Sequence, residues 1–230
     1  MSAIVSRGKV AALEQLEPLA ATQHGYVTRA QALQAGVDDL ALHRLAQSGL
    51  LIGAEHGIYR LLGAPDLPSV TWTSIWVAWL RLDPTVPAVL RAEDPTSGTG
   101  AVVRGPTAAF IQDLGNLPPD PYQFWVARPR QSRRDLVLRT ARSGLQPDDI
   151  TIVRGLPATT PARTIADLIT DHHDLTHVAA VVRDAVDRRL LDPRHPAREL
   201  SDVLTRVLPK RRRLDPATLA QQLLTLAEVS

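Results

Sequence analysis

The chain contains no cysteine, which excludes disulfide bonds, cysteine nucleophiles and thiolate metal sites. No apolar run in it approaches the roughly 18 residues that a membrane-spanning helix needs. The first residues, 1–9, also lack the apolar core of a secretory signal peptide. We therefore expect a soluble protein of the cytoplasm.

Several catalytic signatures are missing as well. The sequence has no serine elbow, no P-loop and no dinucleotide-binding glycine fingerprint. The one cluster with the chemistry of metal ligands is Asp171-His172-His173-Asp174 with His177, in which His173 and His177 stand one helical turn apart. The other histidines show no supporting pattern, and Asp174 has a sufficient role as a helix cap. We expect no metal, no cofactor and no catalytic residue.

What the chain does contain is enough apolar sequence for a folded core. It has 230 residues, 44% of them hydrophobic, which suits one large domain or two small ones. Two prolines and a glycine in residues 63–68 predict a domain boundary there. The expected fold class is α+β: residues 1–65 form a winged helix-turn-helix, and residues 66–230 form a mixed domain with a small antiparallel sheet. Residues 170–230 are expected to be mainly helical.

The winged module is predicted from residues 25–62. Thr28 with Gln31 three residues later fits a capping box, so a helix is expected to start at Thr28. Gly36 supplies the turn that ends this helix, and Asp38 caps a second helix that ends near Gly49. The alternative is a purely structural helical hairpin that binds no ligand.

Segments on both sides of this hairpin complete the module. Residues 7–22 are expected to form a first helix, bent or ended by Pro18. Two short strands are expected at residues 50–52 and 58–61, joined by a glycine-containing hairpin turn. This order of helix, turn, helix and ribbon is typical of modules that lay their second helix in a DNA major groove.

The second helix of the module has one apolar and one polar face. Positions 37, 41, 42 and 45 share the apolar face, whereas Asp39, His43 and Gln47 lie opposite, flanked by Leu40 and Arg44. Residues 1–65 hold as many basic as acidic side chains, and this neutrality counts against strong nonspecific DNA affinity. The expected DNA contacts are Thr28, Arg29, His43, Arg44, Gln47, His56 and Arg60.

A tryptophan stripe marks the start of the expected second domain. Trp72, Trp76 and Trp79 recur at helical spacing within residues 71–82, together with Ile75. An aromatic platform for a ligand is conceivable, but burial in a core is the expected role because tryptophan contributes large apolar area.

Three strands and a basic loop follow. Residues 122–127, 136–140 and 150–153 are expected to form the antiparallel sheet. The loop between the first two is rich in arginine, and is either a solvated hairpin tip or a surface for a phosphate or carboxylate partner. The residues expected on that surface are Arg128, Arg130, Arg133 and Arg134.

The remaining chain has clear helix starts. Thr160 before Pro161 predicts an N-cap followed by proline at the first helical position. Asp174 predicts another cap, and Pro196 and Pro216 predict two further helices. The basic run at residues 210–213 is expected to be a solvated helix end.

Two stretches together resemble a known family. HGYVTRAQALQAGV, LHRLAQSGLL and HGIYRL resemble the N-terminal winged module of AbiEi-type antitoxins from bacterial type IV toxin–antitoxin systems. RGLPATTPARTIADLI and VVRGPTAAFIQDLG resemble segments of actinobacterial members of that family. The order and spacing of these motifs extend the resemblance over residues 1–170.

The resemblance implies a non-enzymatic antitoxin that counters a nucleotidyltransferase-like toxin, with or without a stable complex, and represses its own operon by binding inverted repeats in the promoter. Arg44 matches a commonly basic position of the second helix, and residues 57–60 match the closing strand of the wing. Asp38, Asp39 and Leu40 depart from the Arg or Ser that family members often carry there. A monomer or weak dimer is expected in solution.

Two alternatives stay open. In the first, the winged module no longer binds DNA and serves as a protein-docking surface, as its neutral charge favours. In the second, His172, His173 and His177 serve a metal-dependent hydrolase. We expect no nuclease activity, because the residues after Asp171 lack an ordered set of acidic residues with a lysine.

Overall fold

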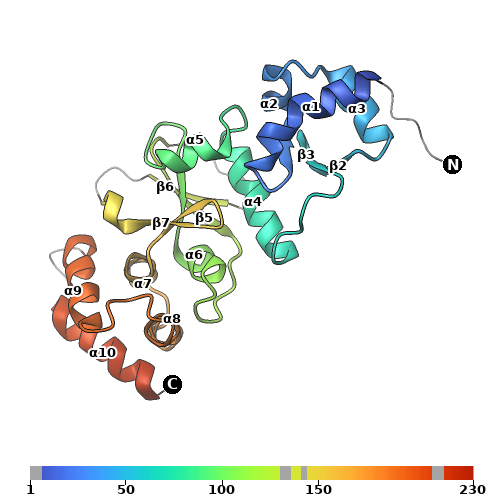
Figure 1. The fold of residues 1–230 in the computed structure, drawn as a ribbon. Coiled ribbons are helices and arrows are strands. Elements are labelled where there is room, and N and C mark those ends of the chain that lie inside the picture. Colours follow the sequence, from blue (N-terminus) through green and yellow to red (C-terminus); the bar gives the residue numbers. More distant parts are fainter. Residues whose placement is uncertain (1–6, 130–135, 141–143, 209–214, 230) are drawn as a thin grey trace. The chain divides into compact units, whose positions relative to one another are not determined.

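The computed structural model describes residues 7–129, 136–140, 144–208 and 215–229. The chain divides into two compact units, residues 1–94 and 95–230 (Figure 1). Residues 66–94 therefore lie in the first unit, and a separate winged domain ending at residue 65 stays a prediction. The fold class is α+β, as expected. Within the described residues, no helix is long and apolar enough to cross a membrane.

The first unit begins with three helices and a three-stranded antiparallel sheet of order β1-β3-β2. Strand β1 was not predicted, because three residues are too few for a visible alternation of polar and apolar side chains. The elements are α1 (Arg7–Ala21), β1 (Tyr26–Thr28), α2 (Arg29–Gln34), α3 (Asp39–Gln47), β2 (Leu51–Glu55) and β3 (Ile58–Leu61).

Both predicted caps of the hairpin are confirmed. The Thr28 hydroxyl accepts a hydrogen bond from the Gln31 amide at 3.1 Å, and the Gln31 side chain accepts one from the Thr28 amide at 3.0 Å. The Asp38 carboxylate accepts from the Ala41 amide at 2.7 Å. The expectation for Pro18 is wrong in one respect, because α1 continues beyond it to Ala21. Leu16 and Ala20 are buried on either side of the proline, and this packing holds the helix together.

The tryptophan stripe lies on α4 (Val70–Leu82) and is buried, as expected. Trp76 and Trp79 stack with ring centroids 5.5 Å apart, and Trp76 meets the edge of His24 at 4.7 Å. The stripe therefore packs within the first unit. Helix α5 (Ala88–Glu93) follows.

The second unit contains a five-stranded sheet of order β6-β5-β4-β8-β7. The sheet is mixed, so the antiparallel arrangement expected here is wrong in detail. β5 pairs with β6 in parallel, and β4 pairs with β8 in parallel. The short segment between β5 and β6 favoured a hairpin, since parallel neighbours usually need a longer crossover. The strands are β4 (Ala101–Val103), β5 (Tyr122–Val126), β6 (Leu136–Thr140), β7 (Ile150–Val153) and β8 (Leu156–Thr159).

Strands β4 and β8 were not predicted. Every residue of both is buried, so neither shows the alternating pattern of a strand with one solvated face. They form the middle of the sheet and lie side by side, which brings the ends of β4 and β8 together before α6 and α7 begin.

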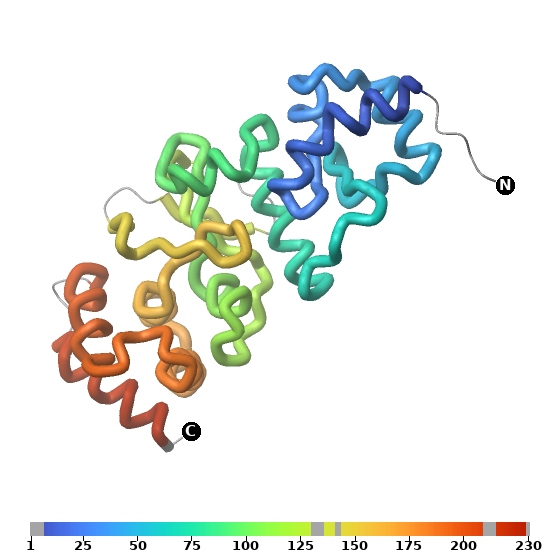
Figure 2. The backbone as a smooth tube through the Cα atoms, in the orientation of Figure 1, coloured from blue at the N-terminus to red at the C-terminus, as the bar shows by residue number. Residues whose placement is uncertain are grey.

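Helices complete the second unit, as Figure 2 traces from green to red. The predicted caps are confirmed: Thr160 caps α7 and Asp174 caps α8. α7 packs against β8, α6, α8 and α9, and its buried face joins a core shared by α6 to α10. The helices are α6 (Gly105–Ile111), η1 (Pro147–Asp149, a 3₁₀ turn), α7 (Pro161–Thr170), α8 (Leu175–Asp187), α9 (Pro196–Val207) and α10 (Pro216–Val229).

Candidate nucleic-acid interface

Helix α3 presents a set of exposed side chains opposite its core face. Leu42 and Leu45 are buried against the other helices of the first unit. His43, Arg44 and Gln47 are exposed, as the helical periodicity predicted. α1 packs on α3, so the outer face of α3 points away from the core of the module.

Leu40 is a member of this face that the sequence argument left out of the expected contacts. Its side chain is 54% exposed, although leucine favours burial. At 100° per residue Leu40 lies beside Gln47, between His43 and Arg44. The sequence already showed Leu40 as an apolar residue on the otherwise polar face of the helix.

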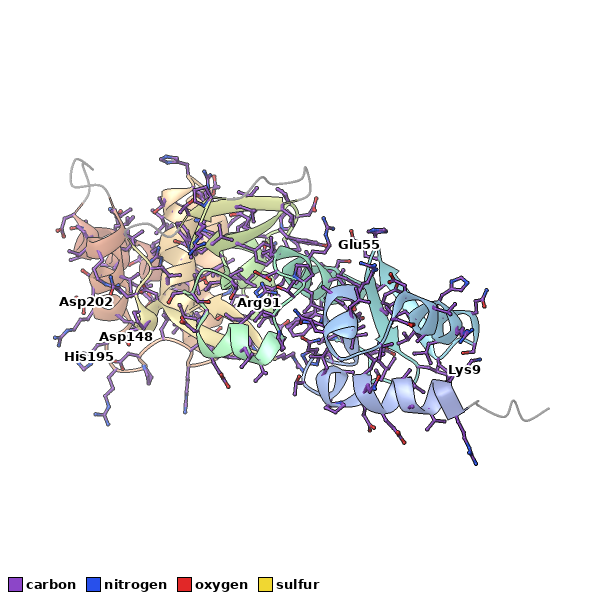
Figure 3. All side chains as sticks on the ribbon, turned by 90° about the horizontal axis from the view of Figure 1, so that it is seen from above. Lys9, Glu55, Arg91, Asp148, His195 and Asp202 are labelled. Carbon is purple, nitrogen blue, oxygen red and sulfur yellow. The ribbon has the colours of Figure 1, made fainter. Side chains whose placement is uncertain are left out.

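The wing is the β2–β3 hairpin, with His56 exposed at its turn. Gly57 there has a φ of +72°, a conformation that favours glycine. The Arg29 amide donates to the Gly57 carbonyl at 2.8 Å, which holds the turn against the start of α2. The Arg81 guanidinium of α4 donates to Glu55 at 2.6 Å and anchors the other side of the wing. Glu55 is labelled in Figure 3.

The two carboxylates at the start of α3 are both engaged. Asp38 caps the helix, and Asp39 forms two hydrogen bonds with Arg29, of 2.6 and 2.5 Å. The hydrogen bond from Arg29 lowers the pKa of Asp39, and the same hydrogen bond raises the pKa of Arg29. Asp39 therefore carries a paired charge at this surface, and the pairing weakens its repulsion of phosphates.

Two of the expected DNA contacts are buried or already bound to other residues of the first unit. Thr28 is fully buried, and its hydroxyl donates to the Pro84 carbonyl. The Arg60 guanidinium is held by Asp66 at 2.9 Å, donates to the Ala64 carbonyl, and lies 5.9 Å from the ring of Tyr26. Thr28 cannot reach DNA from this position, and Arg60 is already bound within its own unit. The sequence showed side chains that can bond DNA at these two positions, but it did not show that they are buried or bound to other residues.

The structure describes one of the four arginines of the expected phosphate or carboxylate surface. Arg128 is exposed just after β5. Arg130, Arg133 and Arg134 lie outside the residues that the structure describes.

The histidine cluster is dispersed by the fold. Asp171 accepts a hydrogen bond from Arg104 at 2.7 Å, and Asp174 caps α8. His172 occupies the left-handed region with a φ of +61°, at the end of α7. Among the described residues, no group of three or more histidines and carboxylates is placed to hold a metal ion.

Comparison with known proteins finds a family match within the first unit. Residues 14–62 match the family described as "Transcriptional regulator, AbiEi antitoxin", a range that spans the end of α1, the hairpin and the wing. No curated protein matches the chain. The chain is similar to the RV2827C protein from Mycobacterium tuberculosis, known from a crystal structure, with 16% identity and a TM-score of 0.44. That match covers 94% of this chain and 81% of the other. The family match therefore covers the N-terminal module, residues 14–62, whose sequence resembles the AbiEi antitoxin transcriptional regulators.

Proposed function

We propose that this protein is the antitoxin of a type IV toxin–antitoxin pair and represses its own operon by binding promoter DNA repeats. The observation that carries the proposal is the exposed face of α3 beside the wing, in a module of a regulator family. Residues 66–230 would counter a nucleotidyltransferase-like toxin, without catalysis and without need of a stable complex. The protein would act in the cytoplasm, where its promoter lies.

The chemistry of the α3 face suits the edges of base pairs. Glutamine can bond adenine through two hydrogen bonds, and arginine can bond guanine in the same way or hold a phosphate. We assign these roles to Gln47 and Arg44, with His43 beside them and His56 reaching from the wing. Arg29 contributes while it is paired with Asp39. Inverted repeats imply two protein copies on the DNA, including the case of a monomer in solution.

The test is the affinity for DNA from upstream of the reading frame. Arg44→Ala and Gln47→Ala should each weaken specific binding about tenfold or more, since a good base contact contributes roughly 1–3 kcal/mol. Both side chains are exposed, so thermal stability should stay nearly unchanged. Fluorescence anisotropy at fixed salt measures the affinity.

The matched control is Lys9→Ala, which removes a basic side chain from α1, the helix that packs on the core side of α3 (Figure 3). Its affinity should match that of the unmodified protein. If the Arg44 and Gln47 variants bind as tightly as the control, the α3 face is not the reading surface.

A protein-docking role for the winged module is the second candidate. The equal number of basic and acidic side chains in residues 1–65 favours it. DNA binding that releases counterions weakens as salt rises, with a negative slope of log affinity against log salt. Absence of binding to the upstream DNA at every salt concentration would favour the docking role.

A further inference from the structure

A cavity of about 390 Å³ in the second unit is lined by four arginines. They come from four parts of the chain: Arg104 follows β4, Arg139 lies in β6, Arg163 in α7 and Arg206 in α9. This size lies within the range of small-molecule sites in proteins.

Two of the arginines are buried over an aromatic ring. Arg104 and Arg163 each have 2% of the side chain exposed, and their guanidinium carbons lie 4.6 and 5.5 Å from the ring centroid of Trp125. Cation–π contacts of this kind hold a guanidinium in place with its nitrogens free to bond elsewhere.

Asp167 holds Trp125 and Arg163 in place through hydrogen bonds. It is 1% exposed and accepts hydrogen bonds from the Trp125 indole at 3.0 Å and from Arg163 Nε at 2.9 Å. Arg104 Nε lies 3.4 Å from the same carboxylate, yet has no hydrogen-bond partner in the part of the chain that the structure describes. Burying this many charges costs free energy, so apolar packing would stabilise the fold better.

The cluster keeps an excess of positive charge and unused donors. The cavity is lined by two carboxylates, Asp167 and Asp171, against four guanidinium groups, and Asp149 lies behind it in contact with Arg163 and Arg206. Within the described residues, neither Nη2 of Arg104 nor Nη2 of Arg163 donates a hydrogen bond. Arg139 is exposed and lies opposite Trp125 in the β5–β6 register, which puts both side chains on the same face of the sheet.

We propose that this cavity binds a small phosphate-bearing ligand. Guanidinium groups donate hydrogen bonds in a planar fork that matches phosphate oxygens, and a buried, fixed fork loses little entropy when it binds. Arg104 and Arg163 provide the fixed donors, and Arg139 and Arg206 close the site from its exposed side. The site is independent of DNA reading by the first unit.

Isothermal titration calorimetry with the full chain tests the proposal, using inorganic phosphate and adenosine 5′-monophosphate as separate probes. Sodium chloride at the same ionic strength is the reference. Tighter binding of the nucleotide indicates a site for a phosphorylated organic ligand, and equal binding of both indicates a site for the phosphate group alone. Either outcome supports the proposal, and heat no larger than with chloride for both probes overturns it.

Variants separate this site from general attraction of anions. Arg139→Gln, on the exposed edge of the cavity, should weaken binding of the phosphate probes about tenfold, the loss expected for a charge-assisted hydrogen bond. Arg206→Gln should do the same and provides a second readout. Arg198→Gln is the matched control, because Arg198 lies on the same helix as Arg206 and is 80% exposed. Equal weakening in the control and the two cavity variants would also overturn the site. Thermal unfolding in chloride checks that each variant is folded.

Discussion

Arg29 and Asp39 lie on different helices of the hairpin and meet through two hydrogen bonds. Both side chains are more than half exposed, so the pair contributes little to stability. Its effect is on the surface that we propose to bind DNA. It holds a carboxylate at the start of α3 next to a fixed positive charge, and it uses two Arg29 nitrogens that could otherwise donate to phosphates.

Removing that carboxylate should strengthen DNA binding. Asp39→Asn frees Arg29 and deletes one negative charge beside the groove, so the plot of log affinity against log salt should steepen by about one unit. Anisotropy titrations across a salt series measure this slope. Glu14→Gln serves as the control, because Glu14 carries the same charge at an exposed site on α1. A slope unchanged from the unmodified protein would show that Arg29 and Asp39 lie off the DNA.

At the scale of elements, the capping box of α2 has a second task. The side chain of Gln31 donates to the Val86 carbonyl, and Thr28 donates to the Pro84 carbonyl. The residues that start α2 therefore also hold the segment that leads from α4 to α5. A helix cap buried in this way tolerates less change than one at the surface.

Thr28→Val should destabilise the first unit by about 2 kcal/mol. Valine keeps the shape of threonine but loses the cap of the Gln31 amide and leaves the Pro84 carbonyl without its donor. Urea unfolding followed by tryptophan fluorescence reports this unit, because Trp72, Trp76 and Trp79 all lie on α4. Thr22→Val, at an exposed site, should change stability by less than about 0.5 kcal/mol. DNA affinity of the folded Thr28→Val protein should be unchanged, since Thr28 does not reach the surface.

At the scale of the whole molecule, the second unit is held by a charge network that crosses elements distant in sequence. Asp149 of η1 accepts hydrogen bonds from Arg163 of α7 and from Arg206 of α9, each at 2.8 Å. Burial alone would raise the pKa of Asp149. The hydrogen bonds from Arg206 and from the Gln146 amide, together with the charge of Arg163, hold that pKa below its ordinary value near 3.8.

This network predicts how the second unit responds to acid. A carboxyl group whose pKa is lower in the folded state stabilises the fold above its unfolded-state pKa, and the stabilisation is lost as the pH falls through the folded-state pKa. Asp149 should therefore contribute fully above about pH 5 and progressively less as the pH falls from there through its lowered folded-state pKa. Hydrogen exchange of the α7 and α9 amides measures this local free energy.

Asp149→Asn should lower that free energy by about 3 kcal/mol at pH 7, because it leaves Arg163 with one carboxylate partner fewer in a buried site. The variant should also lose less stability than the unmodified protein between pH 5 and pH 3. Asp148→Asn, at the exposed neighbouring position, should show the unmodified acid response. Identical acid responses of the Asp149 and Asp148 variants would rule out this role for Asp149.

Much of the fold follows from local chemistry that the sequence displays. The caps at Thr28, Asp38, Thr160 and Asp174 lie where side chains and amides two or three residues apart can bond, and the tryptophan stripe follows the helical period. These signals need no information from distant residues. They also led to the α+β class, whereas the family of the N-terminal module was indicated by the resemblance of its sequence motifs.

The sequence by itself therefore determined the helix starts, the winged module and its outward face at His43, Arg44 and Gln47. The tertiary structure decided the direction of β6 against β5, the burial of Thr28, the capture of Arg60 and the cavity around Arg104 and Arg163. The physical reason is the distance along the sequence between the residues that interact. A cap or a helical face depends on residues within one or two turns, whereas strand order, depth and charge partners depend on segments that only the packed chain brings together.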